Sequence, residues 1–349
     1  METEKKLIQK RFLSYIGKGR GVSSREIFDD VSSGVSYATA KRMLQQLAEE
    51  NLVYTSGNGK GRKYHLDENF QLVVPIDVDE YFSKEADERE IIEGFHFELF
   101  DRIEQSKSIF TTSELDYLNV LQKKHATRVA ALTDWDYRRE MERLVIDLSW
   151  KSSQIEGNTY TLLETEHLLK QKETAAGKTK DEAVMLLNHK EAIDFLLDHS
   201  DYVDRLSLQT IEDIHTILMK ELGVPRNIRN HRVGITGTRY VPLENDFQIR
   251  EAIERMCSVI EGRSNIFEKS LLLLVNLSYI QPFSDGNKRT ARILSNALFI
   301  REGICPLSYR TVDSLAYKKA MLIYYEQNNL SAFKKIFMEQ FEFAVETYF

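Results

Sequence analysis

The chain has 349 residues, of which 42% are hydrophobic, and its formal net charge is −7. The length predicts two or three domains with proper cores. No stretch approaches the roughly 18 uncharged apolar residues of a membrane span, so we expect no membrane partner. Two cysteines form no disulfide framework and the polar N-terminus lacks the apolar core of a signal peptide, which favours a reducing cytoplasm. Scarce Gly and Pro and apolar residues at helical spacing predict a mainly α protein.

Charge is unevenly distributed along the chain. Residues 1–66 carry 12 Lys and Arg against 7 Asp and Glu, a net charge of +5, which leaves −12 for the remainder. A basic head on an acidic body indicates that the two ends meet different partners.

Residues 1–68 are predicted to form a small α+β domain. Apolar spacing and N-cap signals predict three helices, and two short apolar runs around a Gly-rich segment predict a β-hairpin. The expected elements are helices at 5–16, 24–31 and 37–50, strands at 52–54 and 63–66, and a hairpin tip at 56–62. Three helices followed by a β-wing resemble a winged helix-turn-helix domain.

This resemblance implies that the third helix enters the major groove of DNA while the wing neutralises phosphates. The candidate groove contacts are Tyr37, Thr39, Lys41 and Arg42, and the candidate wing contacts are Lys60, Arg62 and Lys63. Because a charge of +5 is modest, a protein-docking role stays open beside DNA binding.

A helical connector at 69–149 follows the head. Val73, Val74 and Pro75 separate the two, and residues 77–93 are strongly acidic. Helices are predicted at 95–100, 117–121 and 137–150. The connector carries no recognisable chemistry, so we expect it to pack on the body and to be a candidate homodimer contact.

The last connector helix continues into the body, residues 150–349, and is predicted to end at Gly157, which suits a helix C-cap. Glu156 then lies at a helix C-terminus, where the dipole disfavours a carboxylate. A cation that meets this side chain would explain its position. Further helices are predicted at 161–172, 181–198 and 207–222, the last with His215 in a structural role.

Residues 229–242 are the least helical part of the body. Val233 and Ile235 alternate with smaller or polar residues and Gly237 favours a turn, which predicts a β-hairpin. After it, helices are predicted at 247–262, 267–280, 315–328 and 330–349.

A polar run, Gln281 to Arg292, lies between apolar helical stretches at 271–280 and 293–300. Gly286 lets backbone N–H groups turn toward a phosphate at the start of the second helix, where the dipole is positive. The same run offers a ligand for a divalent cation, an amide donor and two guanidinium groups on one helix face: Asp285, Asn287, Arg289 and Arg292. The run therefore predicts an anion site.

This run resembles the signature of the Fic/Doc family, His-Pro-Phe-x-[Asp/Glu]-Gly-Asn-[Gly/Lys]-Arg-x-x-Arg, at every position but the first. Gln281 stands where the family has its His. The resemblance covers roughly residues 150–343. It implies a Fic-fold helical bundle with a β-hairpin flap, residues 150–349 forming the Fic domain.

The resemblance further implies transfer of AMP from ATP, with Mg²⁺, to a Ser, Thr or Tyr hydroxyl of a protein substrate or of the chain itself, with release of pyrophosphate. Carried over by position, Asp285 holds Mg²⁺ and Phe283 anchors the loop. Asn287 and Arg289 are then also catalytic, because positioning and charge stabilisation do most of the work in transfers at phosphorus. Relatives on this fold move phosphate or phosphocholine, so the transferred group stays open. The implied nucleotide-binding residues are Phe283, Gly286, Asn287, Lys288, Arg289 and Arg292.

Ser152-x-x-x-Glu156-Gly157 resembles the family's inhibitory motif, [Ser/Thr]-x-x-x-Glu-[Gly/Asn]. This implies that Glu156 pairs with Arg292 and blocks productive placement of the ATP γ-phosphate, as in the subclass whose inhibitory helix precedes the core. The spacing Arg-x-x-x-Val-x-Ile-x-Gly over 229–237 resembles the family flap. It implies that an extended target segment is held by strand pairing, through Val233, Ile235 and Gly237.

Gln281 is the most consequential departure from the family pattern. Gln has no titrating group near neutral pH, so it can orient a hydroxyl but cannot accept its proton. Loss of a general base costs on the order of 10²- to 10⁴-fold in rate. Three explanations stay open: slow or different chemistry in a natural variant, a nucleotide-binding regulator without catalysis, and an introduced substitution. Rescue by His231 on the flap is a further alternative.

The sequence therefore leads to two hypotheses of different classes. The first is a cytoplasmic Fic-type AMP-transferase scaffold, self-inhibited by Glu156, attenuated by Gln281 and fused to a winged helix. The second is an ATP-sensing transcription regulator that no longer catalyses and binds DNA through the winged helix.

Overall fold

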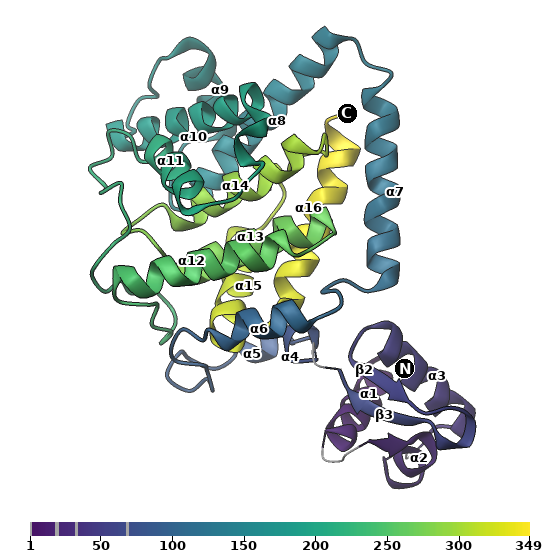
Figure 1. Cartoon of the computed structure of the whole chain (residues 1–349). Helices are drawn as coiled ribbons and strands as arrows, with labels where there is room; N and C mark the ends of the chain where they lie inside the picture. The colour runs from purple at the N-terminus through teal and green to yellow at the C-terminus, as the bar shows by residue number, and fades with distance from the viewer. Residues whose placement is uncertain (1, 18–20, 32–33, 68–69) are drawn as a thin grey trace. The chain divides into compact units, whose positions relative to one another are not determined.

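The structure is a computed structural model of the chain and describes residues 2–17, 21–31, 34–67 and 70–349 (Figure 1). The chain divides into two compact units, Met1–Pro75 with Asp101–Asp116, and Ile76–Phe100 with Tyr117–Phe349. The first unit contains the predicted head together with part of the predicted connector. No helix in the part of the chain that the structure describes is both long and apolar enough to span a membrane.

The first unit contains the three helices and the hairpin that the sequence predicts. Its strands form an antiparallel sheet in the order β1-β3-β2. The sequence missed β1, because two residues are too short to carry an alternating pattern. The elements are α1 (Glu2–Ile16), β1 (Val22–Ser23), α2 (Ser24–Val31), α3 (Tyr37–Glu49), β2 (Val53–Ser56), a 3₁₀ turn (Gly59–Gly61), β3 (Lys63–Leu66) and α4 (Phe70–Val73).

Helix α3 begins at a cap and buries one face. The Ser36 side chain accepts a hydrogen bond from the Thr39 amide at 3.2 Å, which satisfies one of the free N–H groups of the first turn. The apolar stripe along the helix is buried, and it consists of Ala40, Met43, Leu44 and Leu47. Lys41 and Arg42 lie on the opposite face and are exposed.

In the part of the chain that the structure describes, the regular structure of the second unit consists of helices alone. The prediction of a mainly α protein is therefore confirmed. Helices α6 (Glu98–Gln105) and α7 (Thr112–Val129) contain residues of both units. The remaining elements are α5 (Val78–Tyr81), α8 (Asp134–Ile155), α9 (Leu162–Gln171), α10 (Lys180–Asp198), a 3₁₀ turn (Ser200–Val203), α11 (Leu208–Leu218), α12 (Asp246–Glu261), α13 (Ile266–Ile280), α14 (Asn287–Arg301), α15 (Ser314–Gln327) and α16 (Ser331–Thr347).

Helix α13 lies at the centre of the second unit. It is apolar on nearly all sides and buried almost along its whole length, as expected for a helix surrounded by others. It packs against α12, α14 and α15 (Figure 1). The loop that connects α13 to α14 therefore begins at the end of a buried central helix.

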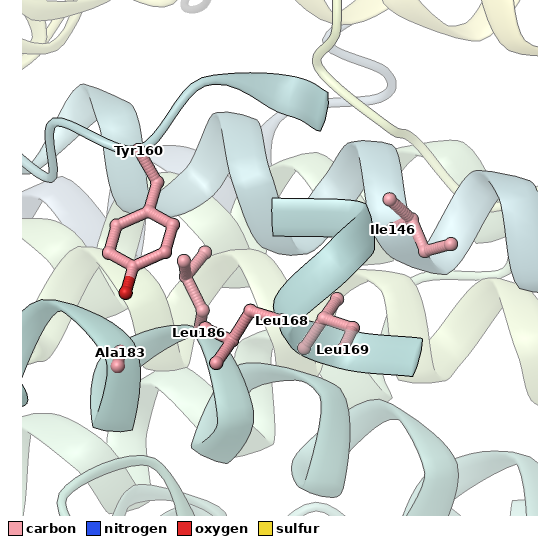
Figure 2. Close-up of a cluster of buried hydrophobic side chains, with 6 residues drawn as sticks. All are labelled: Ile146, Tyr160, Leu168, Leu169, Ala183 and Leu186. Carbon is pink, nitrogen blue, oxygen red and sulfur yellow. The ribbon is translucent and has the colours of Figure 1, made fainter. Parts of the chain in front are cut away.

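A cluster of buried side chains holds the C-terminal part of α8 against α9 and α10 (Figure 2). The Trp150 indole N–H adds a 3.0 Å hydrogen bond to the Tyr160 carbonyl. Helix α8 ends with Glu156 as its C-cap, and Gly157 follows at a φ of 103°, which few other residues adopt. The cluster consists of Ile146, Tyr160, Leu168, Leu169, Ala183 and Leu186.

The β-hairpin predicted for the segment around Val233 and Ile235 is wrong, because these residues form no strand. In the described ranges, every strand belongs to the first unit, and Val241 makes only an isolated parallel bridge with Gly94. Val233 and Ile235 line a cavity instead, together with Gly234 and Thr236 between and after them. We call residues 229–241 the flap.

Candidate functional site

The loop between α13 and α14 is shaped by two residues in left-handed conformation. Gln281 ends α13 at a φ of 52°, and Gly286 precedes α14 at a φ of 80°. A Cβ on Gly286 would lie 2.6 Å from Cε of Met219, so this flexible side chain would have to move, and the positive φ itself favours glycine. No side chain caps the first turn of α14, which leaves its N–H groups available to an anion.

Gln281 and Asn287 hold the loop together. The Gln281 amide donates from Nε2 to the Ser278 carbonyl at 2.6 Å, and its Oε1 accepts from Asn287 Nδ2 at 3.1 Å. Asn287 also closes a ring with Phe283, accepting from its amide and donating to its carbonyl, both at 2.8 Å. Both hydrogens of Asn287 Nδ2 are therefore engaged within the loop.

Phe283 is fully buried, as an anchor of the loop should be. It stacks on His215 of α11, with ring centroids 3.6 Å apart and planes 8° from parallel. Burial lowers the pKa of His215 to about 4, so the imidazole is neutral, and its Nε2 lies 3.0 Å from the Asp285 carbonyl, to which it donates. His215 thus supports the loop from behind.

Arg289 is a buried cation with unused donors. Its side chain is 2–3% exposed, and Nη2 donates to Asp285 Oδ2 at 2.9 Å. Its Nε and Nη1 have no hydrogen-bond partner within the described part of the chain. Because buried donors are nearly always satisfied, these two point to an anion.

Asp285 is the residue that fits a metal best. Its carboxylate is 65% exposed and faces the cavity beside Arg289. No group of three or more His, Cys, Asp or Glu able to hold a metal occurs among the described residues. Mg²⁺ is commonly held by one or two carboxylates together with phosphate oxygens and water, and Asp285 offers one such carboxylate.

Glu156 and Arg292 form an ion pair, the partnership that the sequence predicts. Glu156 Oε1 lies 2.8 Å from Arg292 Nη2, and Oε2 lies 3.6 Å from Lys288 Nζ. Burial would raise the pKa of Glu156, but Arg292 and Lys288 together lower it to about 2. The carboxylate is therefore ionised at neutral pH.

His189 and Tyr317 lie behind this ion pair and were not predicted from the sequence. Ser152 accepts from Arg292 Nε at 2.8 Å, and its Oγ lies 2.7 Å from His189 Nε2. Burial and the nearby Arg292 hold the pKa of His189 well below its usual range, so the imidazole is neutral and shares one hydrogen bond with Ser152, whose direction depends on the tautomer. The ring of Tyr317 lies 5.4 Å from the Arg292 guanidinium carbon. A histidine and a tyrosine on distant helices leave no local pattern that could have identified them.

A cavity of about 380 Å³ brings these parts together. One wall is Glu156, another is the flap at 233–236, and the floor is the loop with the first turn of α14. Arg292 and Phe283 lie behind this surface. Helix α15 closes the cavity with Lys318, Met321, Leu322 and Tyr325.

A second hollow of about 540 Å³ lies on the first unit. Among the predicted DNA contacts, Tyr37, Lys41 and Arg62 line it, whereas Thr39 bonds to Ser36 at the α3 cap. Arg42 and Lys63 are exposed elsewhere on this unit, and the side chain of Lys60 lies outside what the structure describes. Arg25, which the sequence missed, also lines the hollow, and its guanidinium lies over the Tyr37 ring at 5.5 Å.

Comparison with known proteins assigns the central part of the second unit. Residues 205–299 match the model of the Fic/DOC family, a range that includes the flap and the loop but not Glu156. Protein adenylyltransferase Fic of Nematostella vectensis is 29% identical over 186 residues, which are 52% of this chain and 43% of that protein. The counterpart in Culex quinquefasciatus is 28% identical over 198 residues, or 53% and 38%. The chain thus spans less than half the length of these curated relatives.

Solved structures show the same fold. Residues 134–508 of Fic-1 from C. elegans superpose with a TM-score of 0.59 at 20% identity, covering 68% of this chain and 72% of that one. A Fic domain containing signaling protein from Bacteroides thetaiotaomicron gives a TM-score of 0.57 at 18% identity, covering 66% and 94%. Residues 205–299 are therefore similar to the Fic/DOC family, and the part of the chain that these structures cover has the Fic fold.

Proposed function

We propose that the protein is a self-inhibited Fic-type AMP-transferase scaffold that uses ATP to modify a hydroxyl of a protein, releasing pyrophosphate. The observation that carries this proposal is Arg289, a buried guanidinium with two unpartnered nitrogens beside an uncapped helix N-terminus. Both features favour polyphosphate, because each offers N–H donors in a positive electrostatic environment. The similarity to proteins named protein adenylyltransferase Fic supports the same reading.

Each part of the cavity then has a role. Gly286 shapes the turn, and its own N–H donates to Asp285 Oδ1 at 2.6 Å. The N–H groups in the first turn of α14, Lys288 and Arg289 bind phosphate oxygens, and Asp285 holds Mg²⁺, which supplies positive charge against the developing negative charge. Asn287 keeps the loop in shape through its bonds to Phe283. Pre-positioned charge is the main contribution that a protein makes to transfer at phosphorus.

Inhibition follows from the Glu156–Arg292 pair. Arg292 is 0% exposed and its Nη2 is engaged by Glu156 and by the Ser152 carbonyl. While the pair persists, Nε and Nη2 of Arg292 are engaged and only Nη1 is without a partner in the described part of the chain, so the γ-phosphate cannot take the place that the Glu156 carboxylate holds and ATP does not reach a productive geometry. Lys288, whose Nζ lies 3.6 Å from Glu156 Oε2, further stabilises the Glu156 carboxylate in this position.

Attenuated catalysis follows from Gln281. Its amide is 8% exposed and already bonded to Ser278 and Asn287, so it contributes to loop shape and takes no proton. We expect a rate reduced by about 10²- to 10⁴-fold relative to a His at this position. His231 Nε2 lies 3.4 Å from Ser284 Oγ at the loop, which makes it the alternative base.

The flap supplies the surface for the target. The backbone of residues 233–236 makes no backbone hydrogen bond in the part of the chain that the structure describes, although these residues line the cavity. An extended peptide could satisfy these groups by strand pairing, which would bring its hydroxyl toward the bound nucleotide.

The test is labelling with α-³²P-ATP and Mg²⁺. We expect weak or no labelling by the natural sequence, more by Glu156→Gly, and clear labelling of the chain or of a lysate protein by Glu156→Gly with Gln281→His. Glu302→Gly is the matched control, because Glu302 is an exposed helix C-cap remote from the cavity. If the double variant binds nucleotide but labels nothing, the transferase proposal fails and the sensor remains.

The second candidate is an ATP-sensing regulator that binds DNA through a winged helix in the first unit. It is favoured by one observation, the cluster of Arg25, Lys41 and Arg62 around the 540 Å³ hollow between α2, α3 and the hairpin. Guanidinium and ammonium groups gathered on one face suit the phosphates of a duplex.

A gel shift at low salt tests DNA binding. We expect retention of duplex DNA that weakens steeply with salt, and a clear loss in Lys41→Ala with Arg62→Ala. Lys180→Ala with Lys335→Ala removes two exposed cations from the second unit and should leave retention unchanged. Absence of retention at low salt by a folded protein would favour protein docking by this unit.

A further inference from the structure

The flap is anchored at its N-terminal end by Arg229. This side chain is 2% exposed and donates from Nε to the Gln281 carbonyl at 2.7 Å and from Nη1 to the His231 carbonyl at 2.6 Å. Its own amide donates to the Pro282 carbonyl at 3.0 Å. The start of the flap is therefore attached to the loop that shapes the cavity.

A second anchor comes from a residue more than a hundred positions away. Arg89 Nη2 donates to the Gly237 carbonyl at 2.5 Å, at a flap turn where Gly237 has a φ of 86°. The same guanidinium forks onto Glu326 of α15, from Nε to Oε2 at 3.0 Å and from Nη2 to Oε1 at 2.8 Å. One side chain thus joins the flap turn to a core helix.

The Arg89–Glu326 pair is buried on both sides, with side-chain exposures of 6% and 0%. Withdrawing two charges from water is costly unless every donor and acceptor is used. Here Tyr81 also donates to Glu326 Oε2 at 2.6 Å, and the ring of Phe82 lies 4.9 Å from the Arg89 guanidinium carbon. Both carboxylate oxygens of Glu326 thus accept hydrogen bonds, so the buried pair has a defined geometry, unlike an exposed ion pair.

The backbone around Arg89 also runs along the second half of the flap. Arg239 donates from Nη2 to the Arg89 carbonyl at 2.7 Å and from Nη1 to Glu93 at 3.1 Å. The Val241 amide donates to the Glu93 carbonyl at 2.7 Å, and Gly94 bridges Val241 in parallel orientation. Residues 89–94 therefore contact the flap at residues 237–241, whereas residues 233–236 of the flap line the cavity.

We propose that residues 89–94 are a clamp that holds the flap in its target-receiving position before any target arrives, with Arg89 as the positioning residue. That the flap binds a target rests on the proposed function. That residues 89–94 hold the flap in place rests only on the contacts described above. An edge held in advance loses less conformational entropy when a peptide pairs with it. Loosening the clamp should therefore raise the KM for the target and leave nucleotide affinity unchanged.

Hydrogen exchange of the free protein tests the clamp directly. Arg89→Lys keeps the buried positive charge beside Glu326 but lacks the planar fork that reaches the carboxylate and the Gly237 carbonyl together. We expect amide exchange over 236–241, including the Val241 amide, to accelerate about tenfold or more. ADP affinity by calorimetry should stay within about twofold of that of the natural sequence, because Arg89 is remote from the loop.

The matched control is Arg232→Gln. It removes an exposed ion pair with Glu244 from the same flap, so it should not change exchange at 236–241. If Arg89→Lys lowers overall stability, Glu326→Gln provides a second variant that keeps the shape of the side chain and weakens the same fork.

The outcomes separate the clamp from the transferase. Unchanged exchange at 236–241 in a folded Arg89→Lys protein would overturn the clamp. Failure of all variants to label protein would remove the transferase reading while leaving the exchange result intact. In the Glu156→Gly, Gln281→His background, a fall in target kcat with unchanged KM would also contradict a positioning role for Arg89.

Discussion

Buried charges determine the behaviour of the site at the scale of single residues. Glu156 has a pKa of about 2, because Arg292 and Lys288 outweigh the effect of burial, which alone would raise it. A lowered pKa contributes stability that is present above the usual value of 4.5 and is lost as the pH falls toward 2. Mild acid should therefore leave the Glu156–Arg292 lock closed, and ligands or partners have to open it.

Gly286 is the residue on which the phosphate cradle depends. In Gly286→Ala the new Cβ meets Cε of Met219 at 2.6 Å and the φ of 80° becomes strained, so either the Met219 side chain, which is buried, or the loop must shift. We expect ADP affinity, measured by calorimetry, to fall about tenfold or more.

Gly303→Ala is the control for this change. Gly303 has a similar φ of 65°, and a Cβ there meets nothing within 4 Å. Both variants should lose roughly 1 kcal/mol of stability from backbone strain, but only Gly286→Ala should lose nucleotide. Equal affinities in the two variants would show that the loop does not contact phosphate.

At the scale of elements, the end of α8 controls whether Glu156 reaches Arg292. The cluster of Figure 2 fixes this end through residues of three helices. Leu186→Ala, at a fully buried position on α10, should lower the free energy of unfolding by about 2–5 kcal/mol, as measured by urea titration. It should also accelerate amide exchange over 150–158.

Leu163→Ala is the matched change on α9. Leu163 is 76% exposed, so the variant should stay within about 0.5 kcal/mol of the natural stability. If Leu186→Ala destabilised the chain without affecting exchange at 150–158, the cluster would support the fold but not the position of Glu156.

Some features of the site could be predicted from the sequence and others could not. The loop was predictable because its glycine, carboxylate and arginines are contiguous, and the family resemblance supplied the Glu156–Arg292 pair. His189 and Arg89 were not predictable, since each meets the site only after distant segments pack together. The prediction of a hairpin for the flap was wrong because two alternating apolar residues, Val233 and Ile235, are too few to distinguish a strand from an irregular segment that lines a cavity.

At the scale of the whole molecule, the net charge of +5 in residues 1–66 and of −12 in the remainder belongs to a chain of two compact units. The sequence predicts a head that ends at residue 68, whereas the first compact unit continues to Pro75, the residue at which the sequence breaks the head from the rest. The inclusion of Asp101–Asp116 in the first unit was not predictable, because this segment returns from later in the chain and carries no signal of its own.

The rise in Tm of the whole chain on adding ATP or ADP indicates whether Arg292 binds the γ-phosphate. A ligand that binds only the folded state stabilises it by about 2.7 kcal/mol at a concentration of 100 Kd. With Glu156 in place, Arg292 is engaged, so Mg²⁺-ATP and ADP at equal concentration should raise the Tm of the natural sequence by similar amounts. In Glu156→Gly the freed guanidinium can bind a γ-phosphate, so ATP should raise the Tm more than ADP does.

Scanning calorimetry of the full chain distinguishes the two cases, with Glu302→Gly as the control that should behave like the natural sequence. Glu156→Gly alone will be less stable, because it removes the partner of a buried cation. The comparison is therefore between ligands within one variant and not between variants. Equal shifts by ATP and ADP in Glu156→Gly would mean that Arg292 does not receive the γ-phosphate, and that Glu156 stabilises the fold without regulating the site.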